Sequence, residues 1–229
     1  MNAVVETSGL AFAFDATPVL QDIGFSVYAG ERVGIAGANG AGKSTLLWCL
    51  LGLLKGRGQV RVLGQRPTGE GNPAIGAVFQ NPEDQLFMPR LIDDLTLPLV
   101  NQGMPLAEAT SRAEATLESL GLESAAARPA ARLSLGERKR AALAAVLVTG
   151  PQLVILDEPT AELDGSSVRR LVELLNRISL TLIVASHDLH FLQAATSRAL
   201  ILLDGRVVAD GPATTLLADP ALLERAGLI

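Results

Sequence analysis

The chain has 229 residues, a length that fits one sizeable domain, and its net charge is -5 at pH 7. It has no basic footprint of the kind that nucleic-acid binding usually leaves, so we expect no nucleic-acid partner. The longest apolar run, Ala141 to Val148, is far short of the roughly 20 residues of a membrane-spanning helix, and no signal peptide is expected. The single cysteine, Cys49, lies among leucines and is expected to be a buried thiol in a reducing compartment.

The first part of the chain shows the patterns of strands followed by one helix. Alternating apolar residues predict antiparallel strands at Val4–Phe14 and Phe25–Tyr28. A further strand at Arg32–Ala36 runs into a glycine-rich loop, and helical periodicity continues from Ser44 to Leu54. Short strands are then predicted at Gln59–Leu63 and Ile75–Phe79.

The segment from 82 to 133 differs in composition from its surroundings, because it contains five prolines and a helical stretch from Leu106 to Leu120. We predict that it is a mostly helical insertion. A helix from Ser134 to Val148 follows, with Ser134 as N-cap and Glu137 three residues later, the pattern of a capping box. The basic run Arg138–Arg140 within this helix is expected to be a solvated face.

The last part of the chain alternates strands and helices. Leu153–Leu156 and Thr181–Ala185 are unbroken apolar runs, typical of parallel strands buried on both faces. A helix at Ser166–Ile178 lies between them. Asp204-Gly205, between the runs at 200–203 and 206–209, predicts a two-residue hairpin turn, and the tail from residue 213 is expected to be helical.

This order of elements predicts an α/β fold with a parallel core, an attached N-terminal antiparallel β subdomain and an inserted helical subdomain. We expect one domain over residues 1–229, in which 1–81 and 134–229 form the core with its β subdomain. Residues 82–133 are expected to form the helical subdomain.

The glycine-rich loop matches the phosphate-binding pattern G-x-x-x-x-G-K-[ST], with a strand before it and a helix after it. Glycines let backbone N–H groups converge on phosphate oxygens, and the positive end of the following helix points at the same anion. Lys43 is expected to contact the β- and γ-phosphates, and the Ser44 hydroxyl to ligate Mg²⁺. The alternative is a chance glycine-rich turn. The predicted ATP-binding residues here are Gly37, Ala38, Asn39, Gly40, Ala41, Gly42, Lys43, Ser44 and Thr45.

Two carboxylates end the apolar strand Leu153–Leu156, at Asp157 and Glu158. Buried charge is costly unless it is paired or metal-bound, and ligands bind at the carboxyl ends of parallel strands. We expect Asp157 to hold Mg²⁺ and Glu158 to act as general base toward the attacking water. The alternative for such a pair is a charged loop after a strand.

Two further polar residues follow strands of the same predicted sheet. His187 comes two residues after Thr181–Ala185 and is expected to contact the γ-phosphate. Gln80 closes Ile75–Phe79, and its amide oxygen is expected to reach Mg²⁺ or the water. A lone histidine is more often a satisfied structural residue, and that alternative stays open for His187.

These motifs, with Leu133–Glu137 between Gln80 and the carboxylates, stand in an order that resembles the ATP-binding cassette (ABC) family over essentially the whole chain. The resemblance implies a P-loop NTPase (RecA-like) core and ATP hydrolysis. Leu133–Glu137 aligns with the family signature, which implies that Ser134 and Gly136 cap the γ-phosphate bound to an opposite subunit. Leu135 and Glu137 depart from the usual LSGGQ, which leaves the geometry of that cap open.

The resemblance implies two more nucleotide-site residues. Ala161–Asp164 resembles the loop that couples the two ATP sites across a dimer, which assigns Asp164 to the site. Phe14 matches the position of the aromatic that stacks on adenine, and it could equally be a core residue.

The segment Val78–Phe87 is similar to the motor subunits of energy-coupling-factor (ECF) importers, which take up cobalt, nickel, biotin and other vitamins. This implies a subunit at the cytoplasmic face of the cell membrane that docks onto transmembrane subunits. It also implies a homodimer, or a heterodimer with a second ABC ATPase. The alternatives are an ABC ATPase of another transporter and a non-transport, nucleotide-dependent interaction module. A GTP-binding switch is disfavoured, since no asparagine here is followed by lysine.

Overall fold

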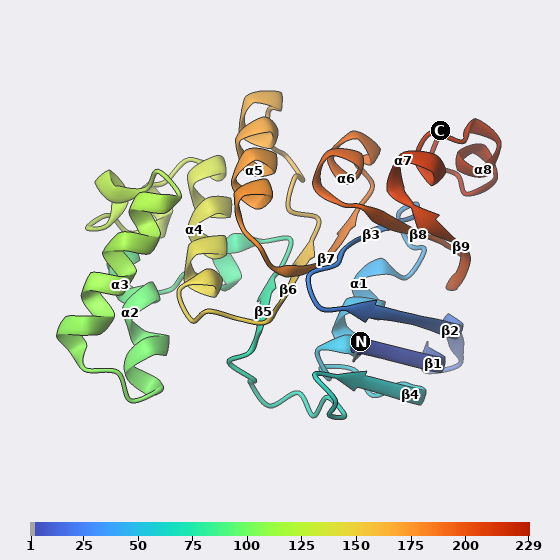
Figure 1. The fold of residues 1–229 in the computed structure, drawn as a ribbon, viewed down its shortest axis with the longest axis horizontal. Helices are drawn as coiled ribbons and strands as arrows, with labels where there is room; N and C mark the ends of the chain where they lie inside the picture. The colour runs from blue at the N-terminus through green and yellow to red at the C-terminus, as the bar shows by residue number, and fades with distance from the viewer. Residues whose placement is uncertain (1–2) are drawn as a thin grey trace.

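The computed structural model describes residues 3–229 as two β-sheets with helices between and beside them (Figure 1). A three-stranded antiparallel sheet has the order β2-β1-β4, and a six-stranded sheet has the order β5-β6-β7-β3-β8-β9. The strands are β1 (Ala3–Phe14), β2 (Thr17–Tyr28), β3 (Arg32–Ala36), β4 (Arg57–Val62), β5 (Ile75–Val78), β6 (Leu153–Asp157), β7 (Thr181–Ser186), β8 (Arg198–Leu203) and β9 (Arg206–Pro212).

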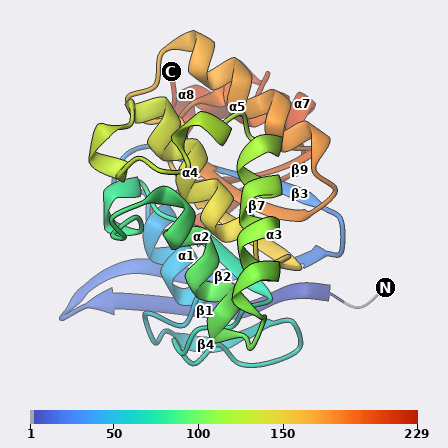
Figure 2. The same cartoon turned by 90° about the vertical axis from the view of Figure 1, so that its left-hand side faces the viewer.

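The helices lie between the sheets and on the far side of the larger sheet. α1 packs against strands of both sheets, whereas α4, α5 and α6 cover the opposite face of the six-stranded sheet (Figure 1). Viewed from the helical side, α2 and α3 stand in front of α4 (Figure 2). The α-helices are α1 (Lys43–Leu50), α2 (Leu91–Asn101), α3 (Leu106–Ser119), α4 (Leu135–Leu147), α5 (Gly165–Arg177), α6 (Leu189–Ala195), α7 (Ala213–Leu216) and α8 (Pro220–Arg225), with short 3₁₀ turns at Pro82–Asp84, Glu123–Ala125 and Ala130–Arg132.

The predicted α/β fold with an attached antiparallel sheet is confirmed, and the differences from prediction are local. β2 begins at Thr17, well before the predicted Phe25, because it pairs with β1 along its whole length. α1 ends at Leu50 rather than Leu54, since Gly52 adopts a left-handed φ of 76° that ends the helix. α6 was not predicted, because its seven residues are too few to show a clear period.

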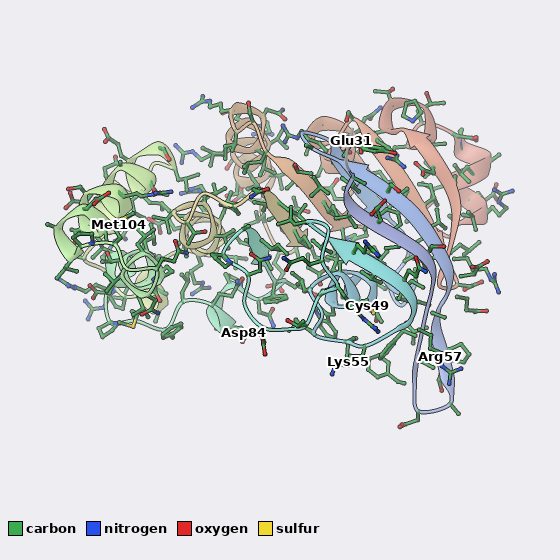
Figure 3. The ribbon with its side chains drawn as sticks, turned by 60° about the horizontal axis from the view of Figure 1, so that its bottom comes forward. Glu31, Cys49, Lys55, Arg57, Asp84 and Met104 are labelled. Carbon is green, nitrogen blue, oxygen red and sulfur yellow. The ribbon has the colours of Figure 1, made fainter. Side chains whose placement is uncertain are left out.

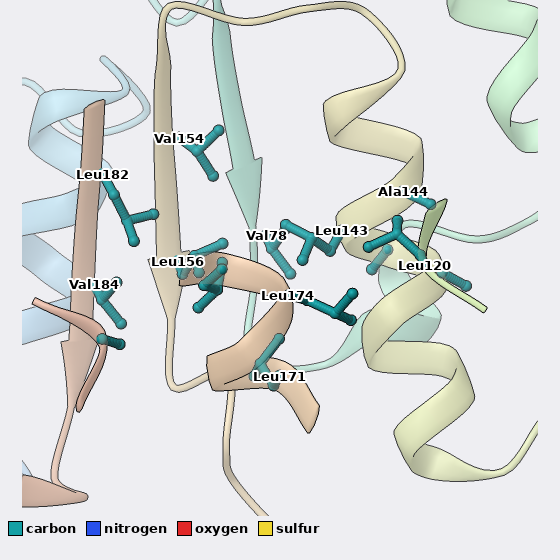
Figure 4. Close-up of a cluster of buried hydrophobic side chains, with 14 of the residues drawn as sticks. Val78, Leu120, Leu143, Ala144, Val154, Leu156, Leu171, Leu174, Leu182 and Val184 are labelled. Atoms are coloured by element: carbon teal, nitrogen blue, oxygen red, sulfur yellow. The ribbon is translucent and has the colours of Figure 1, made fainter. Parts of the chain in front are cut away.

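The central strands of the large sheet are buried on both faces, as their unbroken apolar runs predicted. On β6, Val154 and Leu156 face the cluster formed with α4 and α5 (Figure 4), whereas Leu153 and Ile155 face the cluster formed with α1 and the antiparallel sheet. Successive side chains of a strand point to opposite faces, so one run of residues serves both clusters. β6 is therefore held from two sides, and the residues at its end are fixed in place.

The single cysteine belongs to the second of these clusters. Cys49 lies on α1 (Figure 3). It is 2% exposed, and its burial raises the pKa of the thiol to about 11. The expected buried thiol is confirmed.

The β8–β9 hairpin fixes the position of the glycine-rich loop. Its turn residues have positive φ values, 47° at Asp204 and 73° at Gly205, which fits the predicted two-residue turn. The Gly205 N–H donates to the Ala41 carbonyl at 3.2 Å, and the Gly205 carbonyl accepts from the Gln21 N–H at 2.8 Å. The turn thus joins the glycine-rich loop to β2.

The start of α4 is stabilised by the predicted capping box. Glu137 N–H donates to Ser134 Oγ at 3.3 Å, and Ser134 N–H donates to Glu137 Oε2 at 2.8 Å. Arg128 also pairs with Glu137 Oε1 at 2.8 Å. The hydrogen bond from the Ser134 N–H, together with Arg128, lowers the pKa of Glu137 from 4.5 to about 2.

Gly205→Ala is expected to lower the free energy of unfolding by about 2 kcal/mol or more, because a Cβ there would lie 2.0 Å from the Val19 carbonyl oxygen in a left-handed backbone. Gly30→Ala is the control: its φ is similar at 79°, but a Cβ would meet nothing within 4 Å. Urea denaturation of both variants checks this. An equal loss of stability in the two would show that the contact with Val19 does not matter.

Glu137→Ala is expected to cost about 1 kcal/mol of stability at pH 7, whereas Glu137→Gln retains an oxygen for the capping bond and costs less. Because the folded-state pKa is depressed, the stabilisation by Glu137 is present above pH 4.5 and is lost as pH falls toward about 2. Both variants should therefore lose less stability than the native chain between pH 4.5 and pH 2. Acid denaturation followed by circular dichroism measures the difference, and identical acid profiles would contradict the assignment.

Candidate functional site

One pocket at the carboxyl end of the parallel strands collects most of the predicted site residues. The strand register aligns these ends, since Ala36 pairs with Ser186, Asp157 with Ala185, and Val78 with Leu156. The pocket has a volume of about 390 Å³. Its lining residues are Val19, Asn39, Gly40, Gly42, Lys43, Ser44, Thr45, Gln80, Glu158 and His187.

The glycine-rich loop presents uncapped backbone amides to this pocket. Gly42, the N-cap of α1, has φ 104°, a conformation that residues with a Cβ rarely adopt. No side chain caps the start of α1, so the N–H groups of its first turn are free to bind an anion, favoured by the helix dipole. The predicted phosphate cradle therefore has the geometry that it needs.

Lys43 lies at the base of the cradle with its side chain 6% exposed. Its ammonium donates to the carbonyls of Gly37 at 2.8 Å and Ala38 at 3.3 Å, and it pairs with Glu158 Oε1 at 3.2 Å. This buried cation is thus compensated by the loop and by one carboxylate.

The Glu158 carboxylate is held by Lys43 on α1 and by two residues at the end of β7, Ser186 and the adjacent His187. Its Oε2 accepts hydrogen bonds from Ser186 Oγ at 3.2 Å and from the His187 N–H at 3.3 Å, and lies 2.9 Å from His187 Nδ1. Its backbone has a φ of 45°, which is unusual for a residue other than glycine. A carboxylate so fixed beside a cationic side chain can polarise a water placed against the phosphates.

Asp157 has the properties of an unsatisfied metal ligand. It is 5% exposed, and its Oδ1 is buried without a hydrogen-bond partner. Burial raises the pKa of this carboxyl, whereas the Ser44 hydroxyl and Lys43 oppose that rise. Asp157, Ser44 and the amide of the exposed Gln80 offer oxygen atoms, the ligands that Mg²⁺ prefers, so the residues present fit this ion. Within residues 3–229, no three His, Cys, Asp or Glu residues cluster as a separate metal site.

Seven predicted nucleotide-site residues are not among those that line the pocket: the loop residues Gly37, Ala38 and Ala41, together with Phe14, Ser134, Gly136 and Asp164. Ser134 and Gly136 begin α4, and Asp164 is the N-cap of α5, where it accepts from the N–H groups and hydroxyls of Ser166 and Ser167. Phe14, at the end of β1, is 48% exposed and meets Phe12 edge to face at 4.9 Å. Their roles toward a nucleotide stay predictions.

The expected solvated face at Arg138–Arg140 is wrong. Lys139 is 4% exposed and Arg140 8% exposed, because α4 is covered by its neighbours on this side. The ammonium of Lys139 donates to the carbonyls of Gln80 at 2.9 Å and Glu158 at 3.2 Å. Helical periodicity could have predicted this burial, since Lys139 precedes the buried Ala142 and Leu143 by three and four positions and so lies on the same face of α4.

A second residue that the sequence analysis missed is Ser186, which is fully buried at the end of β7 and holds Glu158. A hydroxyl directly before His187, at the end of an apolar strand, is the signal that could have found it. In the segment after Gln80, the buried Asp94 accepts from the N–H groups of Phe87 and Met88, and Phe87 is 72% exposed.

Comparison with known proteins identifies the family of the chain. The ABC transporter family profile matches residues 20–161. The ECF transporter ATP-binding proteins of Methanocaldococcus jannaschii and Methanothermobacter thermautotrophicus are 34% and 36% identical to the chain, over 98% of it and over 85% and 76% of their own lengths. The structure of CbiO1 from Clostridium perfringens, part of the ABC transporter complex CbiONQ, superposes with a TM-score of 0.87 at 30% identity, covering 100% of this chain and 96% of that one.

No helix in the described part of the chain has the length and apolar character needed to cross a bilayer. One family assignment is supported by three observations: the glycine-rich loop before α1, the carboxylates at the strand ends, and the similarity to these relatives along nearly all of the chain. The chain belongs to the ABC transporter family, as an ATP-binding subunit that hydrolyses ATP.

Proposed function

We propose that this ABC ATPase is the motor subunit of an ECF-type importer, and that it hydrolyses ATP in the pocket built on Lys43 and Glu158. The observation that carries the site assignment is the meeting of these two residues with Gln80 and His187 at one pocket, beside the unpartnered oxygen of Asp157. The importer assignment is supported by the ECF relatives and by the segment Val78–Phe87.

The triphosphate lies along the glycine-rich loop, where amides of the loop and of the first turn of α1 bind its oxygens. Lys43 exchanges its pairing with Glu158 for the β- and γ-phosphates, which carry more negative charge than one carboxylate. Ser44, Gln80 and Asp157 would hold Mg²⁺, which supplies positive charge to the phosphates when bound.

Release from Lys43 leaves the Glu158 carboxylate held by Ser186 and His187, directed toward the pocket. It then accepts a proton from the water that attacks the γ-phosphorus in line, and the products are ADP and phosphate. His187 uses Nδ1 on Glu158, so its other ring nitrogen is the one left for a γ-phosphate oxygen.

The pocket is completed by a second subunit. Ser134, Gly136 and Asp164 lie outside the set of residues that lines the pocket in this chain, although they match nucleotide-site motifs. We propose a head-to-tail homodimer, or a heterodimer with a second ABC ATPase. In it, ATP is held between Lys43 of one chain and the start of α4 of the other, where the helix dipole and the Ser134 hydroxyl meet the γ-phosphate.

The membrane partner docks on the segment after Gln80, at the cytoplasmic face of the membrane. Gln85 closes this segment against β5 by accepting from the Phe79 N–H at 2.9 Å and donating to the Ala77 carbonyl at 2.7 Å. The exposed Glu83 and Asp84 offer negative charge to basic residues of a transmembrane subunit, and Phe87 offers an apolar contact. We propose a transition-metal ion, cobalt or nickel, or a vitamin as the imported solute.

Glu158→Gln is expected to retain ATP binding but to lower turnover about 100-fold or more, because the amide cannot accept the proton. ATP should then accumulate a closed dimer, measured by gel filtration, with phosphate release as the activity assay. Glu173→Gln, on the exposed face of α5, is the matched control. Normal turnover in Glu158→Gln would exclude this residue as the base.

The transport assignment predicts ATP-driven uptake when the chain is reconstituted in liposomes with the membrane proteins encoded beside it. Uptake of labelled Co²⁺, Ni²⁺ and biotin is measured with native chain and with Glu158→Gln as the inactive control. Uptake that needs the native chain supports an importer. ATP-driven export would assign another kind of transporter, and ATP hydrolysis in these liposomes with no ATP-driven movement of any solute would favour a non-transport module.

A further inference from the structure

A buried lysine outside the phosphate loop connects α4 to two parts of the site. Of the three lysines in the chain, Lys43 lies in the cradle, Lys55 is exposed, and Lys139 is 4% exposed on α4. Burying an ammonium is costly unless it is paired or fully hydrogen-bonded. The partners of Lys139 are the backbone carbonyls of Gln80 and Glu158, at 2.9 and 3.2 Å.

These two carbonyls occupy equivalent places at the ends of neighbouring strands. Val78 of β5 pairs with Leu156 of β6, so Gln80 and Glu158 each lie two residues beyond a paired position. Their side chains line the pocket, whereas their main chains bind the same ammonium. Lys139 therefore holds the main chain of Gln80 and Glu158 and makes no hydrogen bond to either side chain.

The hydrogen bond from Lys139 matters most at Glu158, because its backbone φ of 45° is unfavourable for a residue with a side chain. Its N–H donates to the Ala185 carbonyl at 2.9 Å, and its carbonyl accepts from Lys139. Without the hydrogen bond from Lys139 to the Glu158 carbonyl, the main chain at Glu158 loses one of the contacts that keep it in this conformation.

The charge of Lys139 is also balanced locally. Burial lowers its pKa, and the carboxylates of Glu162, Glu158 and Asp157 oppose that change. The lysine thus places one positive charge beside three negative ones, behind the pocket rather than in it. This arrangement differs from Lys43, whose ammonium lies in the cradle itself.

We propose that Lys139 is a positioning residue for ATP hydrolysis, through which α4 sets the main chain of Gln80 and Glu158 relative to the bound γ-phosphate. The proposal rests on the roles proposed above for Gln80 and Glu158. Because Ser134, proposed to meet the ATP of the second subunit, is the N-cap of α4, a shift of this helix on dimer closure would reach both residues through the Lys139 side chain.

The test compares Lys139→Met with Lys55→Met, which makes the same chemical change at an exposed site away from α4 (Figure 3). Steady-state phosphate release should show a kcat reduced at least about 10-fold in Lys139→Met, with the KM for ATP changed less than about threefold, since a small misplacement of reacting groups costs rate rather than binding. Lys55→Met should match the native chain. Lys139→Arg, which retains a cationic donor, should recover part of the loss.

A double variant separates this proposal from the proposed function. Because Lys139 is proposed to act through Glu158 as well as Gln80, adding Lys139→Met to Glu158→Gln should lower kcat by a smaller factor than Lys139→Met does in the native chain. Losses that multiply, a rise in KM with kcat unchanged, or equal kcat in the two methionine variants would each overturn the proposal. Normal turnover in Glu158→Gln alone would instead overturn the assignment of the base.

Folding is checked on the same samples by thermal melting, and hydrogen exchange is measured at the amides near Gln80 and Glu158. Faster exchange confined to these two segments, with melting nearly unchanged, is the result expected of a positioning residue. A uniform increase in exchange throughout the chain would assign Lys139 to stability alone. If Lys139→Met does not fold, Lys139→Gln, which keeps a neutral donor, enters the same comparison.

Discussion

Lys43 and Glu158 meet at 3.2 Å where β3 and β6 end, with side chains only 6% and 8% exposed. Removing two charges from water is costly, and their attraction repays that cost only with good geometry and further hydrogen bonds. Here carbonyls of the glycine-rich loop accept hydrogen bonds from the Lys43 ammonium, while Ser186 and His187 contact the Glu158 carboxylate. Each charged group therefore has a satisfied environment, and in the proposed mechanism Lys43 exchanges Glu158 for a phosphate while Glu158 exchanges Lys43 for a water.

The large sheet makes this meeting possible. Its parallel register brings four strand ends together, and β6 is packed on both faces, so its two terminal carboxylates have little freedom to move. The turn at Gly205 restrains the loop before α1 from the other side through Ala41. The phosphate cradle and the proposed base are thus positioned by different parts of the fold that share one sheet.

The helical elements contribute through α4. Its capping box fixes the helix start, and five residues after Ser134 the ammonium of Lys139 reaches the loops at the ends of β5 and β6. The surface proposed to meet a membrane partner follows Gln80 directly, held by Gln85 and Asp94. In the proposed assembly, the contact with a second subunit and the contact with a membrane partner would therefore both act on the same short stretch of main chain.

The motifs were readable from the sequence because each depends on local chemistry. The spacing of Gly37 to Ser44, the apolar run that ends in Asp157 and Glu158, the capping box at Ser134 and the Asp204-Gly205 turn are all set by residues close in the chain. Secondary-structure type also followed from periodicity, whereas the start of β2 and the end of α1 did not, since pairing with β1 and the φ of Gly52 decide them.

Contacts between distant residues were decided only by the tertiary structure. Lys139 was expected to be solvated but is buried, because segments far away in the chain cover the side of α4 on which it lies. The hydrogen bond from Ser186 to Glu158 and the unpartnered oxygen of Asp157 likewise follow from strand register rather than from composition. The sequence by itself determined which chemical groups stand at the ends of the strands. Only the packing of the sheet and α4 decided which of those groups touch, because contact across a sheet depends on register and burial that no local pattern encodes.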